Sequence, residues 1–135
     1  METERAELTA FYQRYLERCN EHRFEELDEF VSEDVLVNGT TQGLDRYVAG
    51  LRAVVEAFPD YHWDLRHLLI DGDRLSAHLI DTGTHAGTFL GVPATGRAIS
   101  AQELAIYRVH RGKIVECWGD LGSSVRDQLT WGAPG

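Results

Sequence analysis

The spacing of apolar and polar positions changes near residue 60. Before this point, apolar residues recur every three or four positions, which is typical of helices with one buried face. After it, apolar and polar residues alternate, which is typical of strands in a half-buried sheet. Helices followed by hairpins predict an α+β domain in which the helices pack on one face of an antiparallel sheet.

The chain of 135 residues is expected to form a single domain, residues 1–135, because it contains no linker, repeat or low-complexity segment. A curved sheet covered by helices encloses a pocket, so we expect a cavity between the two layers. The predicted elements are a helix over 4–21, a short helix over 24–31, a strand over 35–37, a helix over 44–58, strands over 61–70, 75–85, 97–109 and 113–118, and a short final helix that contains Val125 and Leu129.

Charge and composition exclude several classes of function. The chain has 22 acidic and 13 basic residues, a net charge of −9, and no basic cluster, so we expect no nucleic-acid partner. No apolar run approaches the roughly 20 residues that a membrane span needs, and the charged N-terminus does not resemble a secretory signal. Cys19 and Cys117 match no metal-binding spacing and are expected to be free thiols in a cytoplasmic protein.

Strand alternation predicts which side chains face the pocket. The more apolar set on each long strand is placed inward, and this set includes the acids Asp81, Glu103, Glu116 and Asp120. If Val109 pairs with Ile114, Glu103 lies opposite Asp120. Two carboxyl groups that close cannot both ionise cheaply, so one would act as an acid and the other as a base.

Several alternatives remain open at this point. One acid of the pair could point to solvent beyond a bulge, or Arg97 or Arg66 could neutralise it. Asp81 could be an edge acid in a hydrogen-bonded turn, and His85 could cap a loop. The aromatic residues Trp63, Tyr107 and Trp118 could belong to the core. No metal site is expected, because the histidines show no ligand spacing, and no phosphate-binding loop, nucleophile elbow or Cys/His pair is present.

Residues 58–120 closely resemble the shared core of the SnoaL-like polyketide cyclases, the ester cyclase group. The segment reads FPDYHWDLRHLLIDGDRLSAHLIDTGTHAGTFLGVPATGRAISAQELAIYRVHRGKIVECWGD. Its FPD start, GDR turn, GTH-G-FLG-P-TGR connection and GKIVE-W end together match the family, and the resemblance extends from about Tyr12 to Leu129. It implies the fold of the nuclear transport factor two and ketosteroid isomerase superfamily, a cone-shaped curved antiparallel sheet wrapped around N-terminal helices.

The resemblance also implies an activity, a cofactor-free intramolecular aldol condensation that closes a ring of a small-molecule polyketide. Asp120 matches the acid/base on the last strand, and Asn38 resembles a pocket-facing polar residue. The family's pocket histidine on the preceding strand is replaced here by the run AQELAIY, which moves the second role to Glu103 or His85. The side chains expected to contact substrate are Asn38, His85, Trp118, Trp63, Tyr15, Tyr107 and Asp81.

Two other functions are weighed against this one. The same pocket could serve an isomerase or an epoxide hydrolase, or it could bind a small molecule without catalysis. Members of the family commonly form dimers, and the outer face of the predicted sheet carries small side chains that suit a homodimer. These side chains are Thr82, Thr84, Ser76, Ser100 and Cys117.

Overall fold

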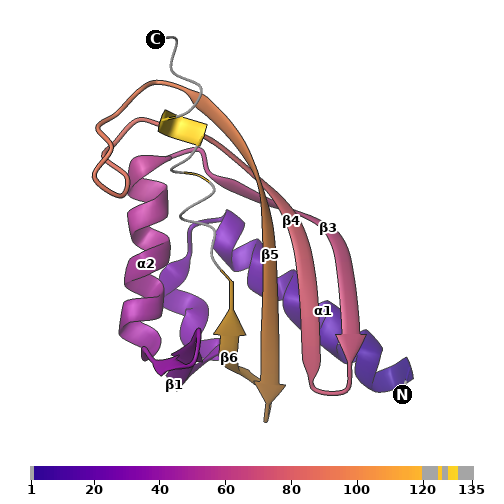
Figure 1. The fold of residues 1–135 in the computed structure, drawn as a ribbon. Helices are drawn as coiled ribbons and strands as arrows, with labels where there is room; N and C mark the ends of the chain where they lie inside the picture. Colours follow the sequence, from indigo (N-terminus) through magenta and orange to yellow (C-terminus); the bar gives the residue numbers. More distant parts are fainter. Residues whose placement is uncertain (1, 120–124, 126–127, 131–135) are drawn as a thin grey trace.

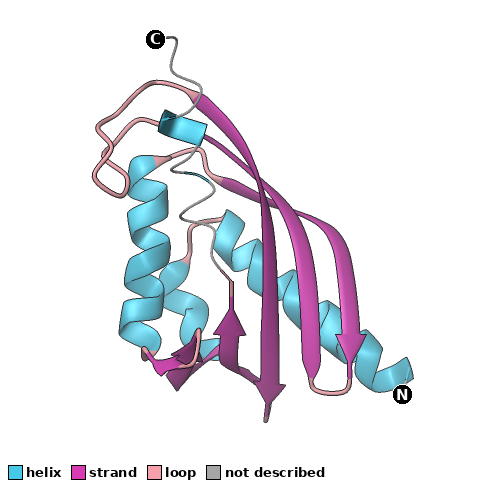
Figure 2. Ribbon diagram, viewed as in Figure 1, coloured by secondary structure: helices cyan, strands magenta, loops and turns pink. Residues whose placement is uncertain are grey.

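The computed structural model describes residues 2–119, 125 and 128–130, and it shows helices covering one side of a curved sheet (Figures 1 and 2). The predicted α+β class is confirmed. The elements are α1 (Glu2–Asn20), the 3-10 helix η1 (Phe24–Glu29), β1 (Val31–Val37), β2 (Thr40–Thr41), α2 (Leu44–Ala57), β3 (His62–Asp71), β4 (Arg74–Thr84), β5 (Ala98–His110) and β6 (Lys113–Trp118). Positions 125 and 128–130 are also helical.

The six strands form one sheet in the order β2-β1-β6-β5-β4-β3. All neighbours are antiparallel except β1 and β6, which run parallel. The prediction of a purely antiparallel sheet is therefore wrong at this one pairing. The three long strands β3, β4 and β5 separate β1 from β6 along the chain, and β6 then pairs with β1 in the parallel direction.

Register shifts interrupt three of the strand pairings, and two of them lie in antiparallel pairings that curve around the helices. One interrupts the pairing of β3 with β4 between Leu65 and His67, and the other interrupts the pairing of β5 with β6 between Arg108 and Val109. A bulge inserts an extra residue on one strand and increases its local bend and twist. The apolar stripe of α1 packs into the resulting concave face, with Tyr12 and Tyr15 buried.

Tight turns connect the hairpins with the backbone geometry that their sequences favour. Asn38-Gly39 and Arg111-Gly112 both have positive φ at the two central positions, as in a type I′ turn. Leu90-Gly91 adopts the same geometry between the bridged residues Phe89 and Val92, in the long connection from β4 to β5. Leucine is unusual at such a position, because a side chain at positive φ crowds its own backbone.

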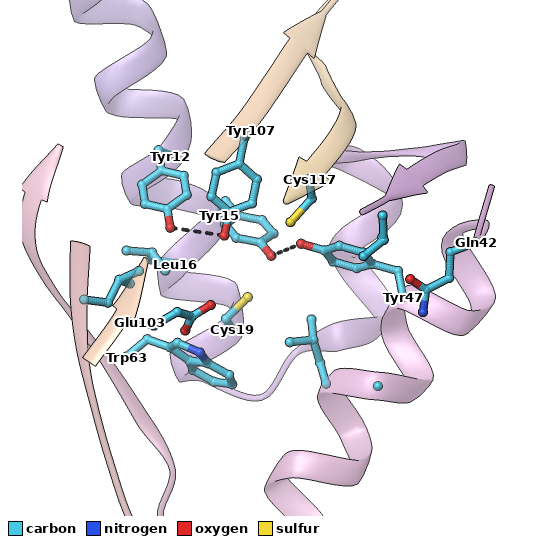
Figure 3. Close-up of a pocket in the computed structure, with 14 residues that line it drawn as sticks. Tyr12, Tyr15, Leu16, Cys19, Gln42, Tyr47, Trp63, Glu103, Tyr107 and Cys117 are labelled. Carbon is cyan, nitrogen blue, oxygen red and sulfur yellow. Dashed lines mark hydrogen bonds between the residues drawn. The ribbon is translucent and has the colours of Figure 1, made fainter. Parts of the chain in front are cut away.

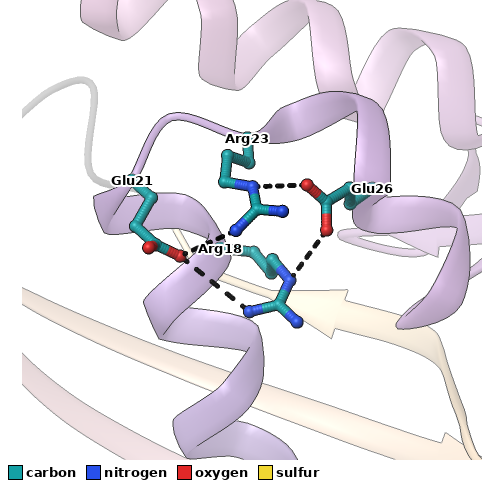
Figure 4. A network of polar contacts seen from close by, with 4 residues as sticks. All are labelled: Arg18, Glu21, Arg23 and Glu26. Atoms are coloured by element: carbon teal, nitrogen blue, oxygen red, sulfur yellow. Dashed lines mark hydrogen bonds and ion pairs between the residues drawn. The ribbon is translucent and has the colours of Figure 1, made fainter.

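Four charged side chains join the end of α1 to η1 (Figure 4). Arg18 forms an ion pair with Glu26 at 3.1 Å, and Arg23 bonds to the same carboxylate. Glu21 lies within 3.9 Å of Arg18 and 3.6 Å of Arg23. Such partly exposed pairs contribute little stability singly, so the network mainly fixes the angle at which the chain leaves α1.

Within the described part of the chain, no helix combines the length and the apolar character that crossing a membrane requires.

Candidate active site

A cavity of about 200 Å³ lies between the concave face of the sheet and the helices α1 and α2 (Figure 3). Four side chains that the sequence assigned to the site line it, namely Tyr15, Trp63, Glu103 and Tyr107. Apolar walls with a few convergent polar groups are typical of sites for small organic ligands.

Four tyrosine hydroxyls lie among the polar groups that line the cavity. Tyr12 donates a hydrogen bond of 3.4 Å to Tyr107, and the hydroxyls of Tyr15 and Tyr47 bond to each other (Figure 3). Burial is the main reason that the pKa of each of these phenols lies above its usual value. All four therefore stay protonated at neutral pH, and each bonded pair leaves one O–H free to donate to a ligand oxygen.

Glu103 is the one acidic side chain among the described residues that line the cavity. It lies in the middle of β5, directly opposite Leu79 on β4. Its Oε1 atom is buried and has no hydrogen-bond partner among the described residues. No Lys, Arg or His side chain lines the cavity in this part of the structure, so nothing cationic neutralises the carboxylate there.

Asp81 lies next to Glu103 on the inner face of the sheet and is fully buried. The hydroxyl of Tyr61 donates a hydrogen bond of 2.9 Å to its Oδ2 atom. Burial, followed by the neighbouring carboxyl group of Glu103, raises the pKa of Asp81 to about 10. Asp81 is therefore a neutral acid at pH 7, and its placement within β4 contradicts the alternative of an edge acid in a turn.

The two cysteines are free, and both line the cavity. Cys117 was expected on the outer face of the sheet, and this expectation is wrong. Burial raises the pKa of each thiol to about 12. Because the thiolate is the reactive form of cysteine, neither side chain is a nucleophile at neutral pH.

The bulge in β6 explains why Cys117 faces inward. Val109 pairs with Ile114 as predicted, but Arg108 then pairs with Glu116, which leaves Val115 as the extra residue. The facing of every later residue in β6 is thereby reversed.

Glu116 and Trp118 are consequently absent from the cavity. Glu116 accepts a hydrogen bond of 3.2 Å from Arg108, and Trp118 lies opposite the exposed Ile106. The prediction that both face inward is wrong because β6 has one extra residue at the bulge.

Asn38 lies at the end of β1 with its side chain exposed. Its amide donates to the carbonyl oxygen of Gly119 and accepts from the Gly119 N–H, both at 3.0 Å. Asn38 thus holds the backbone that follows β6 and does not line the cavity. Asp120, the predicted partner of Glu103, lies outside the described residues.

His85 begins the long connection between β4 and β5 and is fully buried. Its ring stacks on Phe58, and its Nδ1 atom accepts a hydrogen bond of 3.1 Å from the Thr95 N–H. These contacts fix the two ends of the connection together. The structure therefore places His85 in the framework of the loop, away from the residues that line the cavity.

The sequence did not single out four of the chemically informative lining residues. Tyr12 and Cys19 belong to the apolar stripe of α1, Tyr47 lies on α2, and Gln42 lies just before that helix. An apolar stripe shows which helix face is buried, but it does not distinguish a side chain in the core from one that borders a cavity. Among the described residues, no three histidine, cysteine or acidic side chains are grouped as metal ligands.

Comparisons with known proteins point to one family. The family described as SnoaL-like polyketide cyclase matches residues 9–129. A SnoaL-like polyketide cyclase from Agrobacterium tumefaciens is 31% identical, with a TM-score of 0.80 over 90% of this chain and 97% of that one. No curated protein matches the chain.

Two further solved structures share the fold at lower identity. AclR from Streptomyces galilaeus, named as a candidate hydroxylase, is 23% identical, with a TM-score of 0.82 over 96% of this chain and 98% of that one. IdmH from Streptomyces antibioticus, named as a candidate polyketide cyclase, is 24% identical, with a TM-score of 0.75 over 89% of this chain and 96% of that one. At these identities the likeness shows the fold alone.

Proposed function

The chain belongs to the SnoaL-like polyketide cyclase family, and from this premise we propose that it catalyses an intramolecular aldol-type ring closure without a cofactor. Membership of the family supports a polyketide cyclase role. The observation that carries it is Glu103, a carboxylate on a cavity wall beneath a set of phenolic donors.

The proposed reaction needs a base, an oxygen-binding site and a path for one proton. Glu103 removes a proton from the acidic carbon between two carbonyl groups of the substrate, and the enolate oxygen accepts hydrogen bonds from the tyrosine hydroxyls. The carbanion attacks a second carbonyl group, which forms the new C–C bond and an alkoxide. The alkoxide takes back one proton, so the reaction neither consumes nor releases protons overall.

Asp120 is proposed as the second acid/base group, as the family resemblance implies. Asn38 supports this role indirectly, because it fixes the backbone of Gly119, the residue immediately before Asp120. In this scheme Asp120 protonates the alkoxide while Glu103 serves as the base.

Non-catalytic binding is the second candidate function. The free O–H groups of the two tyrosine pairs would hold a ligand with several oxygen atoms whether or not it reacts. Isomerase or epoxide hydrolase chemistry would use the same carboxylate, but hydrolysis also requires a water molecule held between the acid and the substrate.

We also propose that the protein is a cytoplasmic homodimer. The outer face of the sheet exposes the large apolar side chains Leu69 (70% exposed), Leu104 (69%) and Ile106 (45%). Burying this surface against a second copy would remove apolar area from water. Sedimentation analysis should show a dimer that Leu104→Lys converts to a monomer, and a parent protein that sediments as a monomer would contradict this part of the proposal.

Glu103→Gln tests the cyclase proposal, because glutamine keeps the shape of the side chain and removes its charge. Glu116→Gln is the matched control, since it makes the same change on a strand position outside the cavity. Turnover and binding are measured on a panel of keto esters, with Asp120→Asn as a third variant. We expect Glu103→Gln to lower kcat at least 100-fold with binding retained, and Glu116→Gln to change little.

The outcomes separate the two functions. A parent protein that binds a panel member without turning it over favours the binding function. Equal turnover by the parent and by Glu103→Gln would remove Glu103 from the proposed mechanism.

A further inference from the structure

Glu103 and Asp81 are diagonal neighbours on the same face of the sheet. Leu79 pairs with Glu103 and Asp81 pairs with Ala101, so the two acids lie two residues apart on adjacent strands. Diagonal side chains of this kind lie within reach when one of them is long. Asp81 does not line the cavity, whereas Glu103 does.

We propose that Asp81 and Glu103 form a hydrogen-bonded pair in which Asp81 keeps the proton and holds the buried oxygen of Glu103, which leaves the other oxygen of Glu103 to act in the cavity. Asp81 is then a positioning residue for the base of the proposed reaction. The existence of the pair does not depend on that reaction.

The hydrogen-bond inventory of the two acids supports this arrangement. Asp81 Oδ1 and Glu103 Oε1 are both buried and have no partner among the described residues. The second oxygen of Asp81 is already occupied by the Tyr61 hydroxyl. One proton on Oδ1, donated to Oε1, would satisfy both atoms, whereas two ionised carboxylates would leave both oxygens buried and unpaired.

The surroundings decide which acid holds the proton. Asp81 is fully buried, whereas Glu103 borders the cavity and is partly exposed. A charge costs more at the buried position, so the neutral form is favoured on Asp81, in agreement with its raised pKa.

No cation among the described neighbours opposes this assignment. The titratable groups that interact with the pair are Tyr61 beside β3, Tyr12 and Cys19 on α1, and Cys117 on β6. Burial raises the pKa of each one, so all four are neutral at pH 7. The proposed pair therefore carries a single negative charge there.

The consequence for the proposed reaction is one base of fixed orientation. When Glu103 takes a proton from the substrate carbon, the pair becomes neutral. It becomes negative again when Glu103 gives that proton up, which restores the acid form of Asp120 after Asp120 has protonated the alkoxide. Asp81 keeps its proton throughout the cycle. Only this step rests on the proposed function.

Carboxyl carbon NMR on the full chain tests the pair without any substrate. We expect the Asp81 carboxyl signal to show the protonated form throughout the neutral range. Asp60 is the internal control, because its exposed carboxyl accepts hydrogen bonds from Thr84, which hold its pKa below the usual value. In Glu103→Gln, the Asp81 titration should move to lower pH, because the hydrogen bond to a carboxylate and its charge are lost.

Two results would overturn the pair. One is an Asp81 signal that titrates together with ordinary carboxyl groups near pH 4. The other is an Asp81 titration that Glu103→Gln leaves in place. Either result is obtained whether or not the protein proves to be a cyclase, so the failure of the pair and the failure of the proposed function are distinguishable.

The positioning role is tested with two substitutions of Asp81. In Asp81→Asn, an amide N–H can still donate to Glu103, whereas Asp81→Leu removes the donor. We expect the pH profile of kcat/KM in Asp81→Asn to keep its acidic limb, and that limb to shift in Asp81→Leu with at least a 10-fold loss of kcat. Identical pH profiles in both folded variants would contradict the role.

Discussion

Asp81→Asn should remove the pH dependence that Asp81 gives to the stability of the fold. The folded pKa of Asp81 is about 10, whereas an aspartate in an unfolded chain has a pKa of about 3.9. Between these two values, the folded protein keeps a proton that the unfolded chain has lost. The contribution of Asp81 to stability is therefore fully present below about pH 4 and is lost as the pH rises toward 10.

The size of the effect follows from the same two pKa values. The free energy of unfolding should fall by about 1.4 kcal/mol for each pH unit in this range, or about 4 kcal/mol from pH 5 to pH 8. An asparagine side chain can accept the hydrogen bond from Tyr61 and donate one to Glu103, but it does not ionise. The free energy of unfolding of the variant should therefore increase relative to that of the parent protein as the pH rises.

Urea unfolding of both proteins at several pH values between about 5 and 8 measures the difference. Comparing the two proteins at each pH cancels the titration of most other groups. Asp60→Asn is the control, because the lowered pKa of Asp60 affects stability only at more acidic pH. A difference between Asp81→Asn and the parent that stays constant across the range would refute the assignment of a buried proton to Asp81.

Three further substitutions test the framework of the site by thermal or urea unfolding. Gly83→Ala should destabilise the fold by about 1–3 kcal/mol, because the added Cβ would lie 3.1 Å from Phe58 Cβ; unchanged stability would show that the strand can shift. Leu90→Asn should stabilise the protein by about 1 kcal/mol, since asparagine suits positive φ and the leucine side chain is half exposed; a loss would reveal a packing role. Asn20→Ala should weaken ligand binding as well as stability, because Asn20 makes two hydrogen bonds to the backbone of the cavity residue Trp63; unaltered binding would contradict that role.

The regular strands made much of the fold predictable. Alternation placed Asp81 and Glu103 on the inner face, and the structure confirms this because β4 and β5 pair without interruption. The Asn38-Gly39 turn likewise has a local cause, since both residues favour positive φ. The alternation of apolar and polar residues and the choice of turn residues depend on a few neighbouring positions, so both can be recognised in one sequence.

The errors came from features with no local signal. Nothing in the sequence marks Val115 as an extra residue in β6, and this bulge reversed the facing of Cys117 and Trp118. The sequence also offered no reason to consider Asp81 as a partner for Glu103. The expected partner, Asp120, lies outside the described residues, and Asp81 lies on the other strand that neighbours β5. Choosing between two neighbours requires the register of both, which the sequence alone does not provide.

The hydrogen bonds of Asn20 also affect how copies of the protein can meet. β3 is an edge strand, and an edge strand with free N–H and C=O groups invites another strand to pair with it. The side chain of Asn20 bonds to both the N–H and the carbonyl oxygen of Trp63. The Nε2 atom of His22 lies 3.2 Å from the carbonyl oxygen of Tyr61, the residue that precedes β3. The end of α1 thus closes the start of this edge to strand addition, which directs association toward the faces of the sheet and away from continuous growth along its edge.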